Sequence, residues 1–241
     1  MCSDMNDPMI YQIDPRSLIS YRAQRLSQGI KASTLNHDIF ALSGVFKAMA
    51  EASEFHGENP VASLTPLKEA QIEMSYLTTD EISKLLEIAK GDYYRIAVLC
   101  LATGARWGEA YDLKGENIVH NSVMFSHTKN GERRVVPISP DIAGIVKTRE
   151  SGKLFQVSYK TFRRLVKEAK PNLPIGQAVH ALRHTFGTHF MMKGGNILAL
   201  QRILGHSDIS QTMTYAHFSP SYLVEATSYN PLTRVSTFRP Q

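Results

Sequence analysis

The stretch HALRHTFGTHFMMKGG, residues 180–195, decides the fold of the larger part of this chain. Apolar residues recur at four-residue steps from Leu182 to Phe190, which is the spacing of one face of a helix. The glycine pair at its end is a typical helix stop. His180 and Arg183 are three residues apart and therefore lie on a common face. The stretch predicts a helix that packs by one side and presents a histidine and an arginine together.

Two more helices are predicted after this stretch. Ile197 to Leu204 has helical spacing and ends at Gly205, and His206 follows directly. Ser210 can cap a third helix, which contains Tyr215. The pattern therefore places His206 at a helix end and Tyr215 on a helix.

A second group of helices is predicted upstream. Thr78 and Glu81 have the capping-box spacing that begins a helix, and a new domain is expected to open there. Residues 93–103 resemble a buried helix that stops at Gly104, and a short helix follows. Arg106 is therefore expected at a junction between two helices.

The sheet signal lies within residues 118–138. Apolar runs flank Asn130 and Gly131, and Asn-Gly between two such runs is the strongest short signal for a β-hairpin. An earlier turn at Asn121 would give three short antiparallel strands, with Lys129 beside the hairpin tip. The predicted fold class is mainly α with a small three-stranded antiparallel sheet.

The N-terminal part predicts two helices of its own. Asp14 followed by Pro15 is a cap and a first-turn proline. The second helix, with Ser33 or Thr34 as its cap, has a buried apolar stripe.

Pro60 and Pro66 punctuate a stretch without a clear period. We therefore expect a small helical domain over residues 1–66, a linker over 67–76 and a larger domain over 77–241, with a C-terminal tail from about residue 219.

Composition excludes several classes of protein. The longest apolar run, Ile96 to Ala102, is far too short to span a bilayer. Asp4 and Asp7 stand where a secretory signal needs positive charge. The two cysteines do not make a disulfide framework. We expect a cytoplasmic protein with no membrane partner.

The formal net charge is +5, and the positive excess lies after residue 66. Lysines and arginines are dense between Lys147 and Lys170, where only Glu150 and Glu168 offset them. Such a run can follow the phosphates of a polyanion, or it can be the solvated face of a helix. The sequence leaves both interpretations open.

Six residues form an ordered set along the chain. They are Arg106 in ATGARWGE, Lys129, His180 and Arg183 in HALRH, His206 in LGH, and Tyr215. This set resembles the tyrosine recombinases, and the surrounding sequence resembles the P2-like bacteriophage integrases. The resemblance extends from about Tyr76 to Ser219 and, more loosely, over the N-terminal helices. It implies a helical core-type DNA-binding domain followed by a tyrosine-recombinase catalytic domain.

The resemblance assigns the phosphate-binding residues. Arg106 and Arg183 would clamp the phosphate, because a guanidinium meets phosphate oxygens bidentately and stays protonated. His180 would bind the phosphate and exchange a proton with the tyrosine, and His206 would complete the ring. Glu109 is interpreted as a buried partner that orients an arginine.

The resemblance also assigns the reacting groups. Tyr215 would be the nucleophile that forms a 3′-phosphotyrosyl link, and Lys129 the general acid that protonates the departing oxygen. A tyrosine hydroxyl has a pKa near 10, so neighbouring cations are expected to favour its phenolate form.

The implied partners are double-stranded DNA with core-type attachment sites, a homotetramer on that DNA, and host or phage DNA-bending proteins. Neither a cofactor nor a metal is implied. The reaction would integrate and excise a phage genome in the bacterial cytoplasm. P2-like integrases carry a further N-terminal domain for arm-type sites, whereas this chain starts at the core-binding helices. It is either a truncated form or a shorter relative, and high-affinity arm binding is not assumed for it. Residues 222–229 have helical apolar spacing, suited to docking on a neighbouring subunit or on their own domain.

Three other functions remain open at this point. His180 and His184 are spaced like zinc ligands, but position 181 is alanine where the zinc-protease motif needs glutamate, and Arg183 lies beside them. A non-catalytic DNA-binding protein would be expected to have lost one of the six residues. A monomeric topoisomerase would share the same chemistry.

Overall fold

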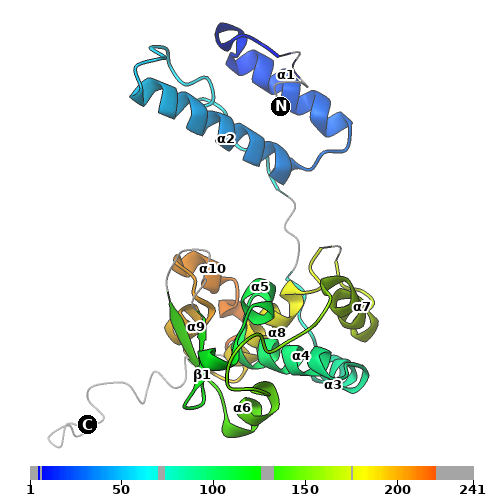
Figure 1. Cartoon of the computed structure of the whole chain (residues 1–241). Helices are drawn as coiled ribbons and strands as arrows, with labels where there is room; N and C mark the ends of the chain where they lie inside the picture. The colour runs from blue at the N-terminus through cyan, green and yellow to red at the C-terminus, as the bar shows by residue number, and fades with distance from the viewer. Residues whose placement is uncertain (1–4, 6, 70–73, 126–132, 175, 221–241) are drawn as a thin grey trace, which may run out of the picture. The chain divides into compact units, whose positions relative to one another are not determined.

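The computed structural model describes residues 5, 7–69, 74–125, 133–174 and 176–220 of the chain, which divides into two compact units, Met1–Glu73 and Met74–Gln241 (Figure 1). Helices dominate both units, and unit 2 contains a three-stranded antiparallel sheet. The predicted fold class is confirmed. The assignment of residues 1–66, 67–76 and 77–241 to a DNA-binding domain, a linker and a catalytic domain stays a prediction.

Unit 1 is built on two helices. Its elements are η2 Ile10–Gln12, α1 Pro15–Ser27 and α2 Ala32–Glu51. The predicted cap of α1 is confirmed, because the Asp14 carboxylate accepts a hydrogen bond of 2.7 Å from the Ser17 amide. The predicted cap of α2 is wrong. That helix begins before Ser33, with Lys31 at its N-cap and no side-chain cap.

The segment that follows α2 is held to it by a buried amide. Asn36 is 4% exposed, and its side chain both donates to the Leu67 carbonyl at 2.9 Å and accepts from the Leu67 amide at 2.8 Å. Beneath it, Leu18 of α1, Ile39 of α2 and Val61 form a small apolar core. Unit 1 therefore closes on itself by packing and by side-chain hydrogen bonds, including those of Asn36 and of Asn59, whose amide donates to Ser43.

Unit 2 is a helical domain with one large apolar core and a smaller apolar cluster that contains Leu200, Leu204 and Tyr215. Its helices are α3 Thr79–Ile88, α4 Asp92–Thr103, α5 Trp107–Tyr111, α6 Pro140–Val146, α7 Tyr159–Ala169, α8 His180–Met192, α9 Ile197–Leu204 and α10 Ile209–Met213, with the short turns η3 Gly115–Asn117 and η4 Ala216–Phe218. The capping box of α3 is present, since the Thr78 amide donates to Glu81 at 2.9 Å. In the ranges that the structure describes, no helix combines the length and the apolar character that crossing a bilayer requires.

The sheet of unit 2 follows the predicted pattern. Strands β1 Ile118–Val119, β2 Ser122–Phe125 and β3 Arg134–Pro137 pair in the order β1-β2-β3. The turn at His120 and Asn121 has positive φ at both residues, 46° and 58°, as a tight primed turn requires. The predicted hairpin tip at Asn130 and Gly131 lies outside the described residues.

The chain enters unit 2 through residues 74–77, which pack on α8 and on the turn at η4. The Leu77 amide donates to Thr185 Oγ1 at 2.8 Å, and the Leu77 carbonyl accepts from His189 Nε2 at 2.9 Å. The rings of Tyr76 and Phe218 meet edge to face at 5.3 Å. This entry segment is therefore part of the folded unit.

Gly115, in the turn η3 that leads into the sheet, lies close to the loop after α6. A Cβ at this position would overlap the carbonyl oxygen of Arg149, which is backbone and cannot rotate away. We expect Gly115→Ala to lower the free energy of unfolding by about 1–3 kcal/mol, as overpacking does. Urea denaturation of the whole chain measures this.

The matched control is Gly144→Ala in α6, where an added Cβ meets no atom within 4 Å. Alanine favours a helix over glycine, so this variant should be neutral or more stable by up to about 1 kcal/mol. Equal stability of both variants would contradict the close approach at Gly115.

Candidate active site

Arg183 is the buried centre of the site. It lies in the first turn of α8, is 4% exposed, and donates to the carbonyl of Gly104 at 2.8 Å and to the carbonyl of Leu204 at 2.7 Å. These carbonyls end helices α4 and α9, whose C-termini carry partial negative charge. Burial, and then the charges of Arg106 and Arg134, lower the pKa of Arg183 to about 9, so the guanidinium remains protonated at neutral pH.

Arg106 occupies the predicted junction between two helices. Gly104, at a φ of 64°, ends α4, and Arg106 is the N-cap of α5. The Arg106 amide donates to Glu109 Oε2 at 2.7 Å, while its guanidinium is 3.3 Å from Glu109 Oε1. Trp107 fixes α5 against α7 by stacking on Phe162 at 5.0 Å. With 28% of its side chain exposed, Arg106 is the more accessible of these two arginines.

Glu109 is a buried partner of an arginine, as predicted, but its main partner is Arg134. The two side chains form a bidentate ion pair at 2.6 and 2.7 Å. Burial alone would raise the pKa of Glu109, but the hydrogen bonds and charge of Arg134, and then of Arg106, hold it below its usual value.

Sequence reasoning missed Arg134. The usable signal was strand alternation, because Arg134 and Val136 occupy inward positions of β3 while Val135 points outward. A charged residue at an inward position needs a partner of opposite charge.

Two predicted histidines lie close to these arginines. Burial, followed by the charges of Arg183 and Arg106, lowers the pKa of His180. The same causes, with Arg134 added, lower the pKa of His206 to about 4. Nδ1 of His206 is also 2.8 Å from Thr212 Oγ1. His206 is therefore neutral at pH 7 and has a fixed ring orientation.

Tyr215 is also close to both arginines, but it is not on a helix. It follows α10, whose cap is Asp208 and not Ser210, and it begins the turn η4. The prediction that one helix contains Tyr215 was wrong, because the short helix α10 ends at Met213 and the separate turn η4 follows it. The side chain is 2% exposed and packs over Gly187, where a Cβ would lie 2.6 Å from Tyr215 Cε1.

Arg183 and Arg106 favour the phenolate of Tyr215 as expected, but they do not determine its protonation in this conformation. Burial raises the pKa of Tyr215 and outweighs the opposite effect of Arg183 and Arg106. The hydroxyl forms a hydrogen bond of 2.9 Å with His184 Nδ1. Burial, and then His180 and Arg183, lower the pKa of His184 to about 4, so this histidine is neutral. The sequence pattern indicated no role for His184 other than that of a metal ligand.

The structure thus brings five of the six predicted residues together. The charges of Arg106 and Arg183 lower the pKa of three of the others, which are His180, His206 and Tyr215. Lys129 lies outside the described residues. Within the described part of the chain, no group of three or more His, Cys, Asp or Glu side chains could hold a metal ion. What the arrangement offers is a cationic site with neutral histidines and a phenol.

Comparison with known proteins supplies the context for this site. The model of the phage integrase family matches residues 75–221, and that of the phage integrase N-terminal domain matches residues 1–68. The integrase of Escherichia phage P2 is 53% identical over 228 residues, which are 94% of this chain and 68% of that protein.

Two solved structures show the same fold. The catalytic domain of bacteriophage HP1 integrase has a TM-score of 0.64 at 43% identity, covering 67% of this chain and 98% of that one. The Tn1549 transposon integrase in complex with a circular intermediate DNA has a TM-score of 0.72 at 21% identity, covering 91% and 86%.

The neutral histidines predict how stability depends on pH. An unfolded histidine has a pKa of about 6.5, whereas His184 and His206 have a pKa of about 4 when folded, so the unfolded chain binds more protons between these values. Their contribution to stability is therefore complete above pH 6.5 and is lost as the pH falls towards 4.

Urea denaturation at a series of pH values across this window should show that the free energy of unfolding decreases as the pH falls from about 6.5 to about 4. His184→Gln, which cannot take up a proton, should have a shallower slope than the wild-type chain. Identical slopes would contradict a neutral, buried His184.

Proposed function

The chain belongs to the phage integrase family, and from that premise we propose that it is a tyrosine-type site-specific recombinase that breaks and rejoins DNA through Tyr215. The Tyr215 oxygen attacks a backbone phosphorus, the bond to the 5′ oxygen breaks, and a 3′-phosphotyrosyl ester forms. The departing oxygen takes a proton. A 5′ hydroxyl then attacks the ester, which rejoins the strand and releases the tyrosine, so neither ATP nor a metal is required.

The observation that carries this proposal is the convergence of two arginines, two histidines and a tyrosine on one site. A phosphodiester gains negative charge on its equatorial oxygens during in-line attack. Preorganised cations and hydrogen-bond donors stabilise that charge. The Arg106 guanidinium is partly exposed, and its one recorded contact in the described part of the chain is with Glu109 at 3.3 Å, so it can receive the phosphate, while the buried Arg183 supplies charge.

The two histidines act in this proposal as neutral groups. A neutral imidazole has one donor and one acceptor nitrogen. His206 has its Nδ1 engaged with Thr212, which leaves Nε2 to contact the phosphate. His180 is exposed at the start of α8, one turn before Arg183, where it can bind the phosphate and exchange a proton. Lys129 is proposed as the general acid.

Cleavage requires a change at Tyr215. The hydroxyl is buried and bonded to His184, so it must leave that contact to reach a phosphate. Transfer of the ring towards the arginines removes the burial that raises its pKa and increases the effect of their charge. The structure corresponds in this proposal to a resting state.

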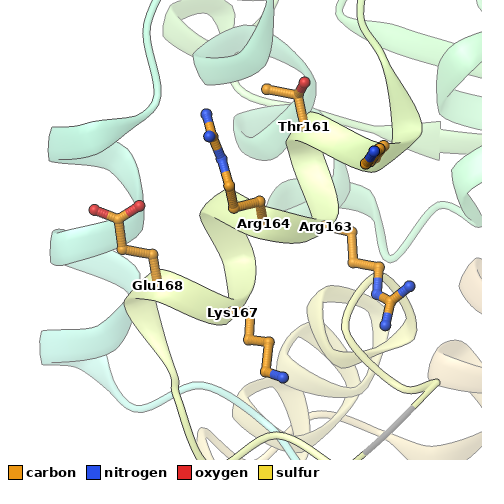
Figure 2. Close-up of a pocket in the computed structure, with 6 residues that line it drawn as sticks. Thr161, Arg163, Arg164, Lys167 and Glu168 are labelled. Carbon is orange, nitrogen blue, oxygen red and sulfur yellow. The ribbon is translucent and has the colours of Figure 1, made fainter.

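The basic face of α7 is the proposed phosphate-tracking surface. Phe162, Val166 and Ala169 are buried beneath the helix. Figure 2 shows Arg163 and Lys167, four residues apart, projecting from one side of α7, with Glu168 on the other. The residues that line the open hollow beside this helix are Lys160, Thr161, Arg163, Arg164, Lys167 and Glu168.

The proposed substrate is double-stranded DNA carrying core-type attachment sites, and the proposed outcome is integration and excision of a phage genome inside a bacterial host. Strand exchange between two duplexes needs four active sites, so a homotetramer on DNA is proposed, with host or phage DNA-bending proteins as accessory partners. The family membership and the two-unit organisation support this proposal.

Replacing Tyr215 by phenylalanine tests the nucleophile directly. The variant removes the hydroxyl and retains the buried ring, so the chain should fold and bind DNA with an unchanged dissociation constant. The covalent protein–DNA adduct, measured on a nicked suicide substrate by denaturing electrophoresis, should disappear. A variant that still forms the adduct would exclude Tyr215 as the nucleophile.

The same substrates separate a recombinase from a topoisomerase. When two suicide duplexes of different length share one core sequence, a recombinase joins strands between them in a reaction that requires both partners. Relaxation of supercoiled DNA without any exchanged product would contradict the proposal.

The α7 surface predicts a specific salt dependence. Arg163→Gln with Lys167→Gln removes two cations, so the slope of log affinity against log salt should decrease by about 2. Fluorescence anisotropy at several salt concentrations measures it. Lys84→Gln with Lys90→Gln, two exposed lysines outside α7, serves as the control. Equal slopes in both double variants would argue against this surface.

A further inference from the structure

Glu109 lies between two arginines that compete for it. Its side chain is 5% exposed, and its two oxygens bind the Arg134 guanidinium at 2.6 and 2.7 Å. The Arg106 guanidinium is on the same carboxylate at 3.3 Å. A bidentate charge-assisted pair is much stronger than one long contact. Among the described residues, Arg134 therefore donates two short hydrogen bonds to Glu109, and Arg106 donates one short bond from its amide and one long bond from its guanidinium.

Arg134 is held in this position on several sides. Its side chain is 6% exposed, and its guanidinium lies 4.4 Å from the centre of the Phe125 ring on β2. A Cβ at Gly205 would lie 3.1 Å from Arg134 Cδ, so the turn that carries His206 packs on its stem. Among the described residues, the only hydrogen bonds recorded for the Arg134 side chain go to Glu109. In that part of the chain, the Arg134 side chain therefore forms hydrogen bonds with no residue other than Glu109.

The consequence of losing Arg134 follows from charge. A buried carboxylate without its cation is strongly destabilised and takes the nearest available one. For Glu109 that cation is Arg106, whose amide already donates to the same carboxylate. The guanidinium of Arg106 would then close on Glu109 and would no longer be available to a phosphate.

We propose that Arg134 is a positioning residue for Arg106: by binding both oxygens of Glu109, it retains that carboxylate as the cap of α5 and leaves the Arg106 guanidinium free for the phosphate. This inference rests on the proposed function, in which Arg106 binds the phosphate. It assigns a role in cleavage to a buried residue whose recorded contacts are with Glu109 and Phe125.

Arg134→Met tests this role, because methionine retains much of the volume and lacks the charge. With DNA saturating and the protein fully folded, the rate of adduct formation on the suicide substrate should fall by roughly 10- to 100-fold, the scale of a misplaced catalytic group. The dissociation constant for DNA should change by less than about 3-fold, since one internal cation is lost.

The decisive variant is Glu109→Gln with Arg134→Met. Glutamine can still accept from the Arg106 amide but has no charge with which to hold the guanidinium. The double variant should therefore cleave at least about 10-fold faster than Arg134→Met alone. Arg134→Lys, which retains the charge without the bidentate fork, should lie between wild type and Arg134→Met. If Arg134→Met does not fold, the double variant and Arg134→Lys decide, since the former leaves no buried charge unpaired.

Arg133→Met is the matched control, because it removes one positive charge from the exposed neighbouring residue. It should cleave within about 3-fold of wild type at saturating DNA. A folded Arg134→Met that cleaves at the wild-type rate would overturn the proposal. So would a double variant no faster than Arg134→Met, because a purely structural role predicts no recovery in folded protein.

Failure of the proposed function is distinguishable from failure of this inference. If the wild-type chain forms no adduct, the proposed function fails, and the crystal structure of Arg134→Met then decides the role of Arg134. A bidentate contact between Arg106 and Glu109 in that structure supports the inference. An Arg106 guanidinium in its wild-type position overturns it.

Discussion

The buried guanidinium of Arg183 is the interaction on which the arrangement of unit 2 depends. It donates to the last carbonyls of two helices, at Gly104 and at Leu204, and so brings the ends of α4 and α9 together. Each helix end has a glycine with positive φ beside it, and a Cβ on Gly104 would lie 2.6 Å from Leu204. The candidate site is therefore built where helices stop, and one cation neutralises two negative helix termini.

This constraint determines which residues can approach each other. Arg106 follows Gly104 by two residues, and His206 follows Leu204 by two, so Arg183 places both next to itself by holding the helix ends. Glu109 balances part of the positive charge that accumulates there, and Arg134 adds to that charge. Three arginines and one carboxylate leave the site positive, which suits an anionic group in a place largely screened from water.

Much of the fold could be predicted from sequence because its signals are local. Capping at Asp14 and at Thr78, the stop at Gly104 and the alternating strands around Asn121 each depend on residues close in the chain. Local motifs and the family resemblance also predicted six site residues, and the five of them that lie in the described ranges converge in space.

What could not be predicted depends on contacts between distant residues. The ion pair of Arg134 with Glu109 joins positions 25 apart, and Tyr215 meets His184 across 31 residues. Burial raises the pKa of Tyr215 by more than the charges of Arg183 and Arg106 lower it, and this balance depends on the three-dimensional packing of the ring. The prediction that Tyr215 lies on a helix was wrong for a related reason, since packing of its ring over Gly187 favours a turn at that point.

The entry segment of unit 2 gives the buried tyrosine a wider significance. Met74 packs in the same apolar cluster as Tyr215, and Tyr76 lies against Phe218, three residues after it. A displacement of residues 74–77 removes packing from Tyr215, and departure of the tyrosine removes packing from residues 74–77. The two events share one free energy, so linkage makes them reciprocal: whatever displaces residues 74–77 also changes how readily the hydroxyl becomes available.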